Sequence, residues 1–503
     1  NIHDKVDRYL KEVLSQTQIS LLTRSRAVLV QIKTFSTRHK FQDCNAYICE
    51  LFEALGAAKV SPKAGLLSAA FEMKRTQRMV SKYTQQNFLD LPLCDDPKIN
   101  MAVDIVKAGI TALYLGNPPL FIMLTCKGLQ LSLKYGISPS TPMTMSCVGI
   151  LFASMKDFDK ACELGESGLA ICEKHGMKKV LPQVVAQTFA FIRHYRRPMP
   201  QYVAPLRYAM DVGLRMGVME DVSLAKGMFC CMVNATGTTA LPQALPEMER
   251  YLRNIKHQGH TDQWLHTVTS VQFAQILSRP NGNDNTSLDG DFMNEGEMFA
   301  LVRSKGENVV LGFLNNYKVQ LLVHFGDPLD AIKHGEESAQ MGISYGPGTP
   351  FISRFRFFVG LANIQAYEKT KKRKYLKTAR TIKKGLNELV KHQNPNVLYF
   401  LLMLQAEITR VLRGSSKDKT VLNYLNEAAV SARRMGSLID NAFALELRAC
   451  CYLDPRQQSF DEAQGLYYMR QAIKSYQEYG AVAKVIHLQK KYNDLLFVRH
   501  PLN

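Results

Sequence analysis

The sequence is poor in tryptophan, lacks long apolar runs and has no paired-cysteine motif. Trp264 is the only tryptophan among 503 residues. The longest apolar runs, at 118–124 and 399–404, are well short of the ~20 residues that span a bilayer. The eleven cysteines form no CxxC pair and no Cys/His cluster at zinc spacing. These absences argue against a membrane-spanning helix and a disulfide framework, and they predict a reducing, cytoplasmic location.

Catalytic signatures are also missing. No Gly-x4-Gly-Lys-[Ser/Thr] phosphate loop occurs, and the nearest glycine-rich run, at 346–350, lacks both the lysine and the spacing. The kinase glycine-rich loop, HRD and DFG motifs are absent, as is a Gly-x-Ser-x-Gly nucleophile elbow. We therefore predict that this segment is not an enzyme and carries no cofactor.

One cluster of residues could form a metal site. His260, Asp262 and His266 fall within two helical turns, close enough together to hold a metal ion. The alternative is the polar start of a helix. We favour this alternative, because Thr261 or Asp262 makes an ordinary N-cap, and we predict no metal site.

Acidic residues are fewer than basic ones. The chain has 63 Lys and Arg against 44 Asp and Glu, a net charge of +19, which favours anionic partners. The densest cationic segment, at 369–384, also has apolar residues at helical spacing, namely Tyr375, Ala379, Ile382, Leu386 and Leu389. Its candidate residues for binding an anionic partner are Lys371, Lys372, Arg373, Lys374, Lys377, Arg380, Lys383 and Lys384. This amphipathic helix is either a solvated face or a surface for nucleic acid, anionic lipid or an acidic partner domain.

Two smaller basic features have simpler interpretations. The stretch 193–198, RHYRRP, is predicted to complement a local helix dipole. Arg354 and Arg356 alternate with phenylalanines at 351–358, a pattern that could stack bases. Core packing of a helix explains those phenylalanines better. We expect Trp264 in the core or in a groove.

The sequence does contain a series of glycines, each of which follows a helix-forming stretch. These glycines are Gly56, Gly136, Gly176, Gly217, Gly259, Gly342, Gly436 and Gly480, and skipped copies are expected at Gly306 and Asn394. Glycine commonly ends a helix because it adopts the left-handed conformation without a Cβ penalty. The gaps are close to forty residues or twice that, which is typical of repeated helix pairs.

The clearest repeat copy lies at 147–176. Gly149, Ala161 and Gly168 supply small residues where two helices approach, and Phe152 and Phe158 fill the space between them. This pattern resembles a tetratricopeptide repeat. It predicts an all-α fold, namely a right-handed α-solenoid of helix-turn-helix repeats with a period of about 40 residues and a concave face.

We predict one solenoid over residues 1–503. Its parts are degenerate repeats at 1–96, the best-formed repeats at 97–277, a polar loop insertion at 278–297, and C-terminal repeats at 298–503 that end near 496. The chain begins at Asn1 with no signal-peptide pattern, so we expect a piece of a longer polypeptide.

Three separated stretches carry a further resemblance: FLDLPLCDDPKINMAVDIVKAGITALYL (88–115), LSLKYGISPSTPMTMSCVGILFASMKDFDKACELGESG (131–168) and MRQAIKSYQEYGAVAKVIHL (469–488). They resemble the helical-repeat middle region of very large signalling proteins that also contain a predicted AAA-type ATPase, a Ser/Thr kinase-like domain and histidine kinase domains. The resemblance implies a sensor or scaffold role coupled to enzymatic domains elsewhere in the parent chain.

These observations support two functional hypotheses. The first is a non-catalytic regulatory module that holds a protein partner or a neighbouring domain in its concave groove. The second is a basic helical-repeat protein that binds nucleic acid, but no pair of polar residues recurs at a fixed repeat position as a base code requires.

Overall fold

The computed structural model describes residues 2–16, 18–37, 40–279, 285–340, 349–413, 418–455, 459–493 and 495. Over these residues the fold is all-helical, with α-helices α1 to α25 and three short π or 3-10 segments. The described ranges contain no strand, only an isolated bridge between Leu93 and Ile137. The all-α prediction is confirmed. None of the described helices is both long and apolar enough to cross a bilayer.

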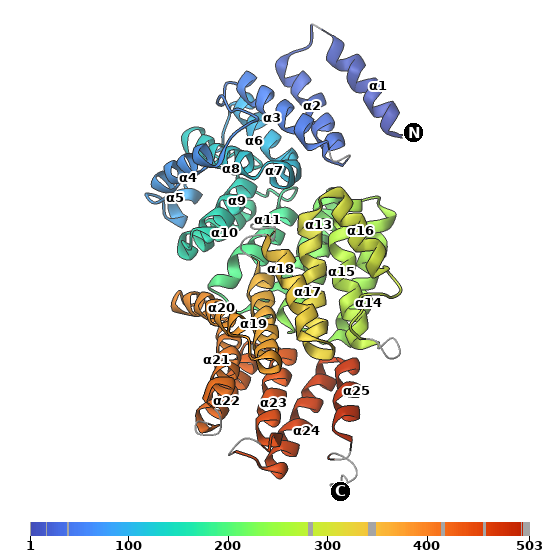
Figure 1. Cartoon of the computed structure of the whole chain (residues 1–503). Helices are drawn as coiled ribbons and strands as arrows, with labels where there is room; N and C mark the ends of the chain where they lie inside the picture. The colour runs from blue at the N-terminus through green and yellow to red at the C-terminus, as the bar shows by residue number, and fades with distance from the viewer. Residues whose placement is uncertain are drawn as a thin grey trace. The chain divides into compact units, whose positions relative to one another are not determined.

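The chain forms two compact units (Figure 1). The first comprises residues 1–193 and 208–222. Its helices are α1 (Ile2–Ser15), α2 (Leu21–Thr37), α3 (Phe41–Ala54), α4 (Leu66–Val80), α5 (Gln85–Leu89), α6 (Pro97–Ala108), α7 (Ile110–Gly116), α8 (Pro118–Tyr135), α9 (Thr141–Ser154), α10 (Phe158–Lys174) and α11 (Leu181–Gln187), followed by the π-helical segment Thr188–Ile192.

The second unit comprises residues 194–207 and 223–503. Helices α12 (Val203–Met216) and α13 (Met219–Thr236) contribute residues to both units. The remaining helices are α14 (Leu241–His257), α15 (Thr261–Ser278), α16 (Glu295–Lys305), α17 (Asn308–Phe325), α18 (Pro328–Gln340), α19 (Pro350–Thr370), α20 (Arg373–Lys391), α21 (Leu398–Arg413), α22 (Asp418–Arg434), α23 (Leu438–Leu453), α24 (Glu462–Tyr479) and α25 (Val482–Lys491). The predicted end of the repeats near residue 496 lies outside the described residues.

Helices that follow one another pack as pairs, and the α9–α10 pair is the clearest repeat copy of the sequence. A Cβ on Gly149 would lie 3.0 Å from the carbonyl oxygen of Ala161, and one on Gly168 would lie 2.9 Å from that of Pro142. Phe152 and Phe158 are fully buried. The small residues therefore permit the close approach that the sequence predicted. The right-handed superhelix and the period stay predictions.

Most of the expected glycines do reverse the backbone after a helix. Positive φ angles occur at Gly56, Gly136, Gly176, Gly217, Gly259, Gly306, Gly436 and Gly480, and also at Gly237, which was not predicted. Gly342 lies outside the described residues. The prediction for Asn394 is wrong, because the residue with positive φ is Gln393. The Oδ1 atom of the buried Asn394 accepts a hydrogen bond from the amide of Asn396 at 2.9 Å instead.

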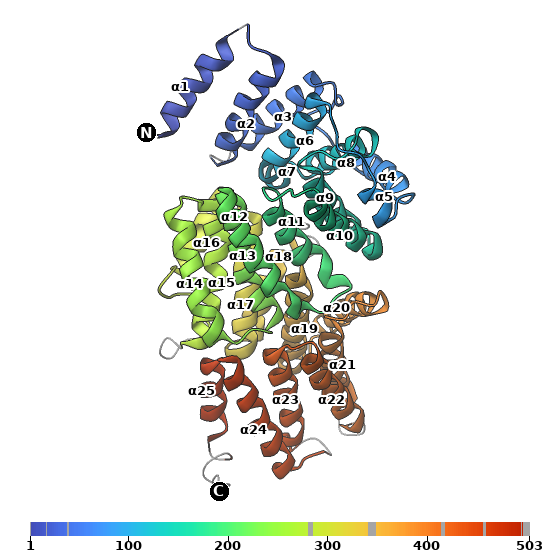
Figure 2. The same cartoon turned by 180° about the vertical axis from the view of Figure 1, so that it is seen from behind.

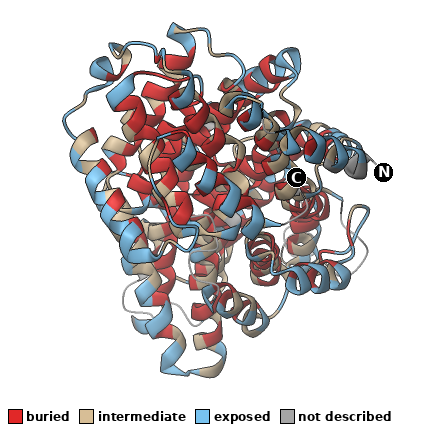
Figure 3. Ribbon diagram, turned by 90° about the horizontal axis from the view of Figure 1, so that it is seen from above, coloured by how far each residue is buried: buried red, intermediate tan, exposed pale blue. Residues whose placement is uncertain are grey.

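The second unit also contains contacts between helices that are distant in sequence. Helix α25 packs against α15, the amide of Leu438 donates to the carbonyl of Gly237 at 2.9 Å, and a Cβ on Gly480 would lie 2.4 Å from Pro242. Repeats of a solenoid contact mainly their neighbours, and these helices depart from that pattern. Figure 2 shows the helices from behind, and Figure 3 colours the ribbon by how far each described residue is buried.

Candidate functional site

Helix α20 carries most of the predicted cationic residues, and its rotation is set by an apolar side. Leu376, Ala379 and Leu386 are buried against the neighbouring helices α19 and α21. Of the predicted apolar stripe, Ala379 and Leu386 are therefore in the core, whereas Tyr375, Ile382 and Leu389 are half-buried. Leu376 was missed. The helix is amphipathic as predicted, but Leu376 rather than Tyr375 is buried at its amino-terminal end.

Most of the cationic residues lie on the side away from this core, and Lys383 is the exception. Lys371 ends α19 with a φ of 58°, and Lys372 is the N-cap of α20. All eight candidate residues are exposed except Lys383, which is half-buried. Four of them, at positions 373, 377, 380 and 384, have the spacing of one helix face and extend over about 16 Å. We call the eight residues the α20 cationic face.

None of these eight cations has a carboxylate oxygen within 4.0 Å among the described residues. Other exposed cations nearby do, because Lys391 pairs with Glu388 at 3.1 Å and Lys369 pairs with Asp327. The Lys374 ammonium lies over the Tyr375 ring at 4.9 Å. The α20 cationic face therefore has no neutralising partner in the part of the chain that the structure describes.

The end of α20 is held by the basic stretch 193–198. Arg196 donates a hydrogen bond to the carbonyl oxygen of His392, the C-cap of α20. The Nδ2 atom of Asn396 donates to the carbonyl oxygens of His194 at 2.7 Å and of Arg197 at 2.8 Å. Arg196 thus complements the dipole at the carboxyl end of α20, a helix distant in the sequence, rather than that of an adjacent helix end.

The phenylalanine–arginine stretch of α19 belongs to the core. Phe351, Phe357 and Phe358 are buried, and Arg354 is also inside, with its Nη1 atom 2.9 Å from Asp440 Oδ2. Arg356 is exposed. These side chains pack the second unit, so the core-packing interpretation is confirmed over base stacking.

Among the described residues, no group of three or more His, Cys, Asp or Glu side chains is arranged to hold a metal ion. The Nδ1 atom of His260 lies 2.7 Å from Ser223 Oγ. The N-cap prediction is wrong. The N-cap of α15 is His260, without a side-chain capping bond, and Thr261 is already helical. Trp264 is half-buried, with the Lys256 ammonium 5.4 Å from its ring.

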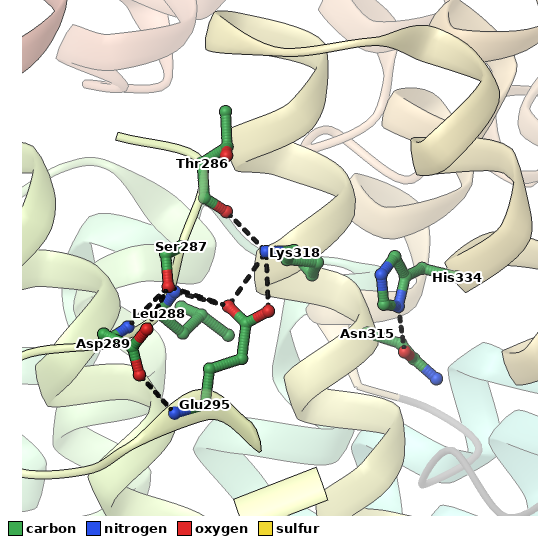
Figure 4. Close-up of polar contacts among 8 residues, drawn as sticks. All are labelled: Thr286, Ser287, Leu288, Asp289, Glu295, Asn315, Lys318 and His334. Carbon is green, nitrogen blue, oxygen red and sulfur yellow. Dashed lines mark hydrogen bonds and ion pairs between the residues drawn. The ribbon is translucent and has the colours of Figure 1, made fainter. Parts of the chain in front are cut away.

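A polar cluster fixes the loop that precedes α16 (Figure 4). The Lys318 ammonium donates to both carboxylate oxygens of Glu295, at 2.7 and 2.9 Å, and to the carbonyl oxygen of Thr286 at 2.8 Å. Glu295 also accepts from the amide of Leu288, and its own amide donates to Asp289 Oδ1 at 2.7 Å. Residues 285–294 of the predicted insertion at 278–297 are thus tied to α16 and α17, whereas Ser278 already belongs to α15 and 295–297 to α16.

The contacts of this cluster hold the loop in place. The Ser287 hydroxyl donates to Asp289 at 2.8 Å and to Glu295 at 3.4 Å. The Nδ1 atom of His334 contacts Asn315 Oδ1 at 2.8 Å, and burial lowers the pKa of this imidazole, with Lys318 contributing. The serine hydroxyl is thus bonded to carboxylates while the imidazole is bonded to an amide. These contacts differ from the serine–histidine pair of a nucleophilic site.

Comparisons with known proteins identify no family for this chain. No protein-family model matches it, and neither does any curated protein sequence. Among solved structures, it is similar to one described as a circular tandem repeat protein with novel repeat topology and enhanced subunit contact surfaces. The sequence identity is 10%, the match covers 93% of this chain and 99% of that one, and the TM-score is 0.16. A likeness this low carries no argument about fold or function.

Proposed function

We propose that this chain is a non-catalytic interaction module, and that its α20 cationic face binds an acidic segment of a protein partner or of a neighbouring domain. The observation that carries the proposal is that this face is exposed and without carboxylate partners among the described residues. The family resemblance adds the finer proposal of a cytoplasmic sensor or scaffold within a larger signalling ATPase or kinase. A right-handed solenoid of forty-residue repeats, with a concave groove, belongs to the same proposal.

The spacing of the cations suits an extended acidic partner. Cations one helical turn apart repeat about every 5.4 Å along α20, so a partner helix with acidic residues at the same spacing can face several of them. A single exposed ion pair contributes only about 0–1 kcal/mol, so useful affinity needs several pairs at once. The eight clustered residues meet this requirement better than scattered lysines would.

Nucleic acid is the second candidate, favoured by the same unpaired cations. Single-stranded nucleic acid also needs exposed aromatic rings on which the bases stack. The aromatic ring within the cationic face, Tyr375, is half-buried and covered by Lys374. The face therefore offers charge with little stacking surface, which favours an acidic protein segment.

The test is a binding titration with two fluorescent probes, a glutamate-rich helical peptide and a single-stranded RNA of equal charge. The α20 triple variant, Lys377→Gln, Arg380→Gln and Lys384→Gln, should lose at least tenfold in peptide affinity. The matched control removes three exposed cations elsewhere in the second unit, with Arg433→Gln, Arg434→Gln and Lys490→Gln. It should bind the peptide as wild type does.

Two outcomes would contradict the proposal. Equal loss in both triple variants would mean that only net charge matters. Submicromolar RNA binding that persists at physiological salt, with no peptide binding, would instead support the nucleic-acid function. A weak RNA affinity that falls with a slope of about −0.7 per phosphate contact is the generic electrostatic contribution.

A further inference from the structure

Helix α4 lies at the outer edge of the first unit, beside α5 and α8 (Figures 1 and 2). One of its sides packs against α8, and another, which we call its open side, carries exposed residues. On the fixed side, Glu72 accepts from the Lys127 ammonium at 3.0 Å and from Gln130 Nε2 at 2.6 Å. Gln130 Nε2 also donates to the hydroxyl of Thr76 at 2.8 Å. These buried polar contacts fix the rotation of α4 about its axis, and so they determine which residues point away from α8.

The open side begins with three large apolar side chains in the first two turns. Leu66, Leu67 and Phe71 are 71%, 90% and 70% exposed. No other large apolar residue among those described is as exposed as any of these three. Exposed apolar groups scattered singly need no explanation, but three on one helix end mark a surface that is covered in use.

Cations follow on the same side in the later turns. Lys74, Arg75 and Arg78 of α4, and Lys82 two residues beyond its end, are exposed and, with Phe71, line a hollow of about 420 Å³. Arg75 is 3.9 Å from Glu72, which is already engaged by Lys127. The other three cations have no carboxylate within 4.0 Å among the described residues. The open side of α4 therefore combines exposed large apolar side chains with positive charges, most of which have no carboxylate partner among the described residues.

We propose that this side of α4 binds the surface of an anionic lipid membrane. Leu66, Leu67 and Phe71 enter the boundary between headgroups and acyl chains, and the four cations contact lipid phosphates. Stable peripheral binding needs two signals of this kind, because an apolar anchor or a basic patch is weak alone. The net charge of +19 attracts the whole chain to the same surface.

The small size of the surface favours a membrane over a protein partner. Helix α4 has 15 residues, so its open side is about 22 Å long and about 10 Å wide, or about 220 Å² in projection. A stable protein interface buries about 800 Å² on each partner. A bilayer surface, in contrast, needs only one helix side with a few inserted groups.

The experiment is co-sedimentation of the full chain with vesicles of phosphatidylcholine alone or mixed with phosphatidylserine. We expect binding to the mixed vesicles only. Lys74→Gln, Arg78→Gln and Lys82→Gln together should lower the partition coefficient about 100-fold, since each cation near an anionic surface contributes about fivefold. Leu67→Ser with Phe71→Ser should lower it at least tenfold while the charge is unchanged.

The triple variant Arg433→Gln, Arg434→Gln and Lys490→Gln is the matched control, because it removes the same charge from exposed positions in the other unit, outside both proposed binding surfaces. It should retain most of the binding, and far-UV circular dichroism should show all variants to be as helical as wild type. Phe71→Trp adds a depth probe, whose fluorescence should be quenched by brominated lipid beyond the level seen for wild type.

The proposal is overturned if wild type does not sediment with the mixed vesicles, or if the α4 charge variant and the control triple variant at 433, 434 and 490 lose binding equally. It is also overturned if the α4 charge variant loses affinity for the glutamate-rich peptide instead, because α4 is then a protein-binding surface. Failure of the α20 peptide test leaves this result unaffected, since the two surfaces are probed by different variants.

Discussion

Arg354 is a charged side chain in the interior of the second unit. Its guanidinium donates to Asp440 Oδ2 at 2.9 Å and to Gln320 Oε1 at 3.1 Å, and Asp440 also accepts from the Ser437 hydroxyl at 2.6 Å. The side chains of Arg354 and Asp440 are 2% and 1% exposed. This pair connects α19 with α23, so its value lies in fixing which helices meet.

Replacing Arg354 alone should be strongly destabilising. Arg354→Met leaves the Asp440 carboxylate buried without its cation, and we expect a loss of about 3–5 kcal/mol in the free energy of unfolding. Trp264 is the only tryptophan and lies in the second unit, so urea unfolding followed by its fluorescence measures that unit. Arg354→Met combined with Asp440→Leu should recover most of the loss. If the double variant is as unstable as the single one, packing rather than charge explains the effect.

His324 should make the second unit sensitive to acid. Its ring packs against those of Phe358 and Phe443, with centroid distances of 5.2 and 4.9 Å. Burial lowers its pKa well below the usual value, with Lys484 and Arg354 adding to the effect. The unfolded state therefore takes up a proton first. Stability is fully present above a pH of about 6.5 and falls by about 1.4 kcal/mol per pH unit below it.

The measurement compares wild type with His324→Phe in urea unfolding between about pH 7.5 and about pH 5. Other groups also titrate in this range, so the informative quantity is the difference in slope. Below about pH 6.5, the free energy of unfolding of the variant should fall less steeply than that of wild type, by about 1.4 kcal/mol per pH unit. Parallel stability curves would show that the ring is not protonated more easily in the unfolded chain.

At the scale of elements, two helix ends show that adding a Cβ at a glycine can lower stability in two ways, by backbone strain and by steric overlap. Gly306 has a φ of 68°, and a Cβ there meets no atom within 4 Å. Gly480 has a φ of 88°, and a Cβ there would lie 2.4 Å from Pro242 Cδ. Gly306→Ala should cost about 1–2 kcal/mol from backbone strain alone. Gly480→Ala should cost about 1–3 kcal/mol more, because it also overpacks the contact with α14.

Gly385→Ala is the control for both. It lies within α20, and a Cβ there meets no atom within 4 Å, so alanine should raise stability by about 0.5–1 kcal/mol. All three variants can be followed by the same fluorescence-detected urea titration. Equal losses at Gly306 and Gly480 would mean that the turn after α24 yields without disturbing α14.

The sequence predicted helix ends well where glycine was required and poorly where another residue took its place. Lys156, Lys371 and Gln393 have positive φ without being glycine. All three are exposed, and no composition signal marks them. The α20 cationic face was predictable from helical spacing. Its lack of carboxylate partners was not, since those partners could have come from any neighbouring helix.

At the scale of the whole molecule, the spacing of the glycines predicts local helix pairs but not contacts between helices that are distant in the sequence. The contact of α25 with α15, and the hydrogen bond from Lys484 to the carbonyl oxygen of His324 at 3.4 Å, join segments far apart in the second unit. Glycine spacing contains no information on such contacts. They depend on side chains such as Lys484, which also pairs with Glu446 at 2.9 Å and is buried although charged.

The net charge of +19 leads to a last prediction, which separates a binding role from a structural one for the α20 cationic face. Its like charges at three- and four-residue spacing repel one another by about 0.2–0.5 kcal/mol per pair. The α20 triple variant should therefore be more stable than wild type at about 10 mM salt, where the Debye length is about 30 Å, and equally stable at about 0.15 M, where it is about 8 Å. Urea unfolding at both salt concentrations measures this difference, with the triple variant at 433, 434 and 490 as the control. A triple variant that is less stable at both concentrations would mean that these lysines and arginines support the fold. A gain confined to low salt would mean that the fold tolerates a cost there, as expected of charges that a partner neutralises.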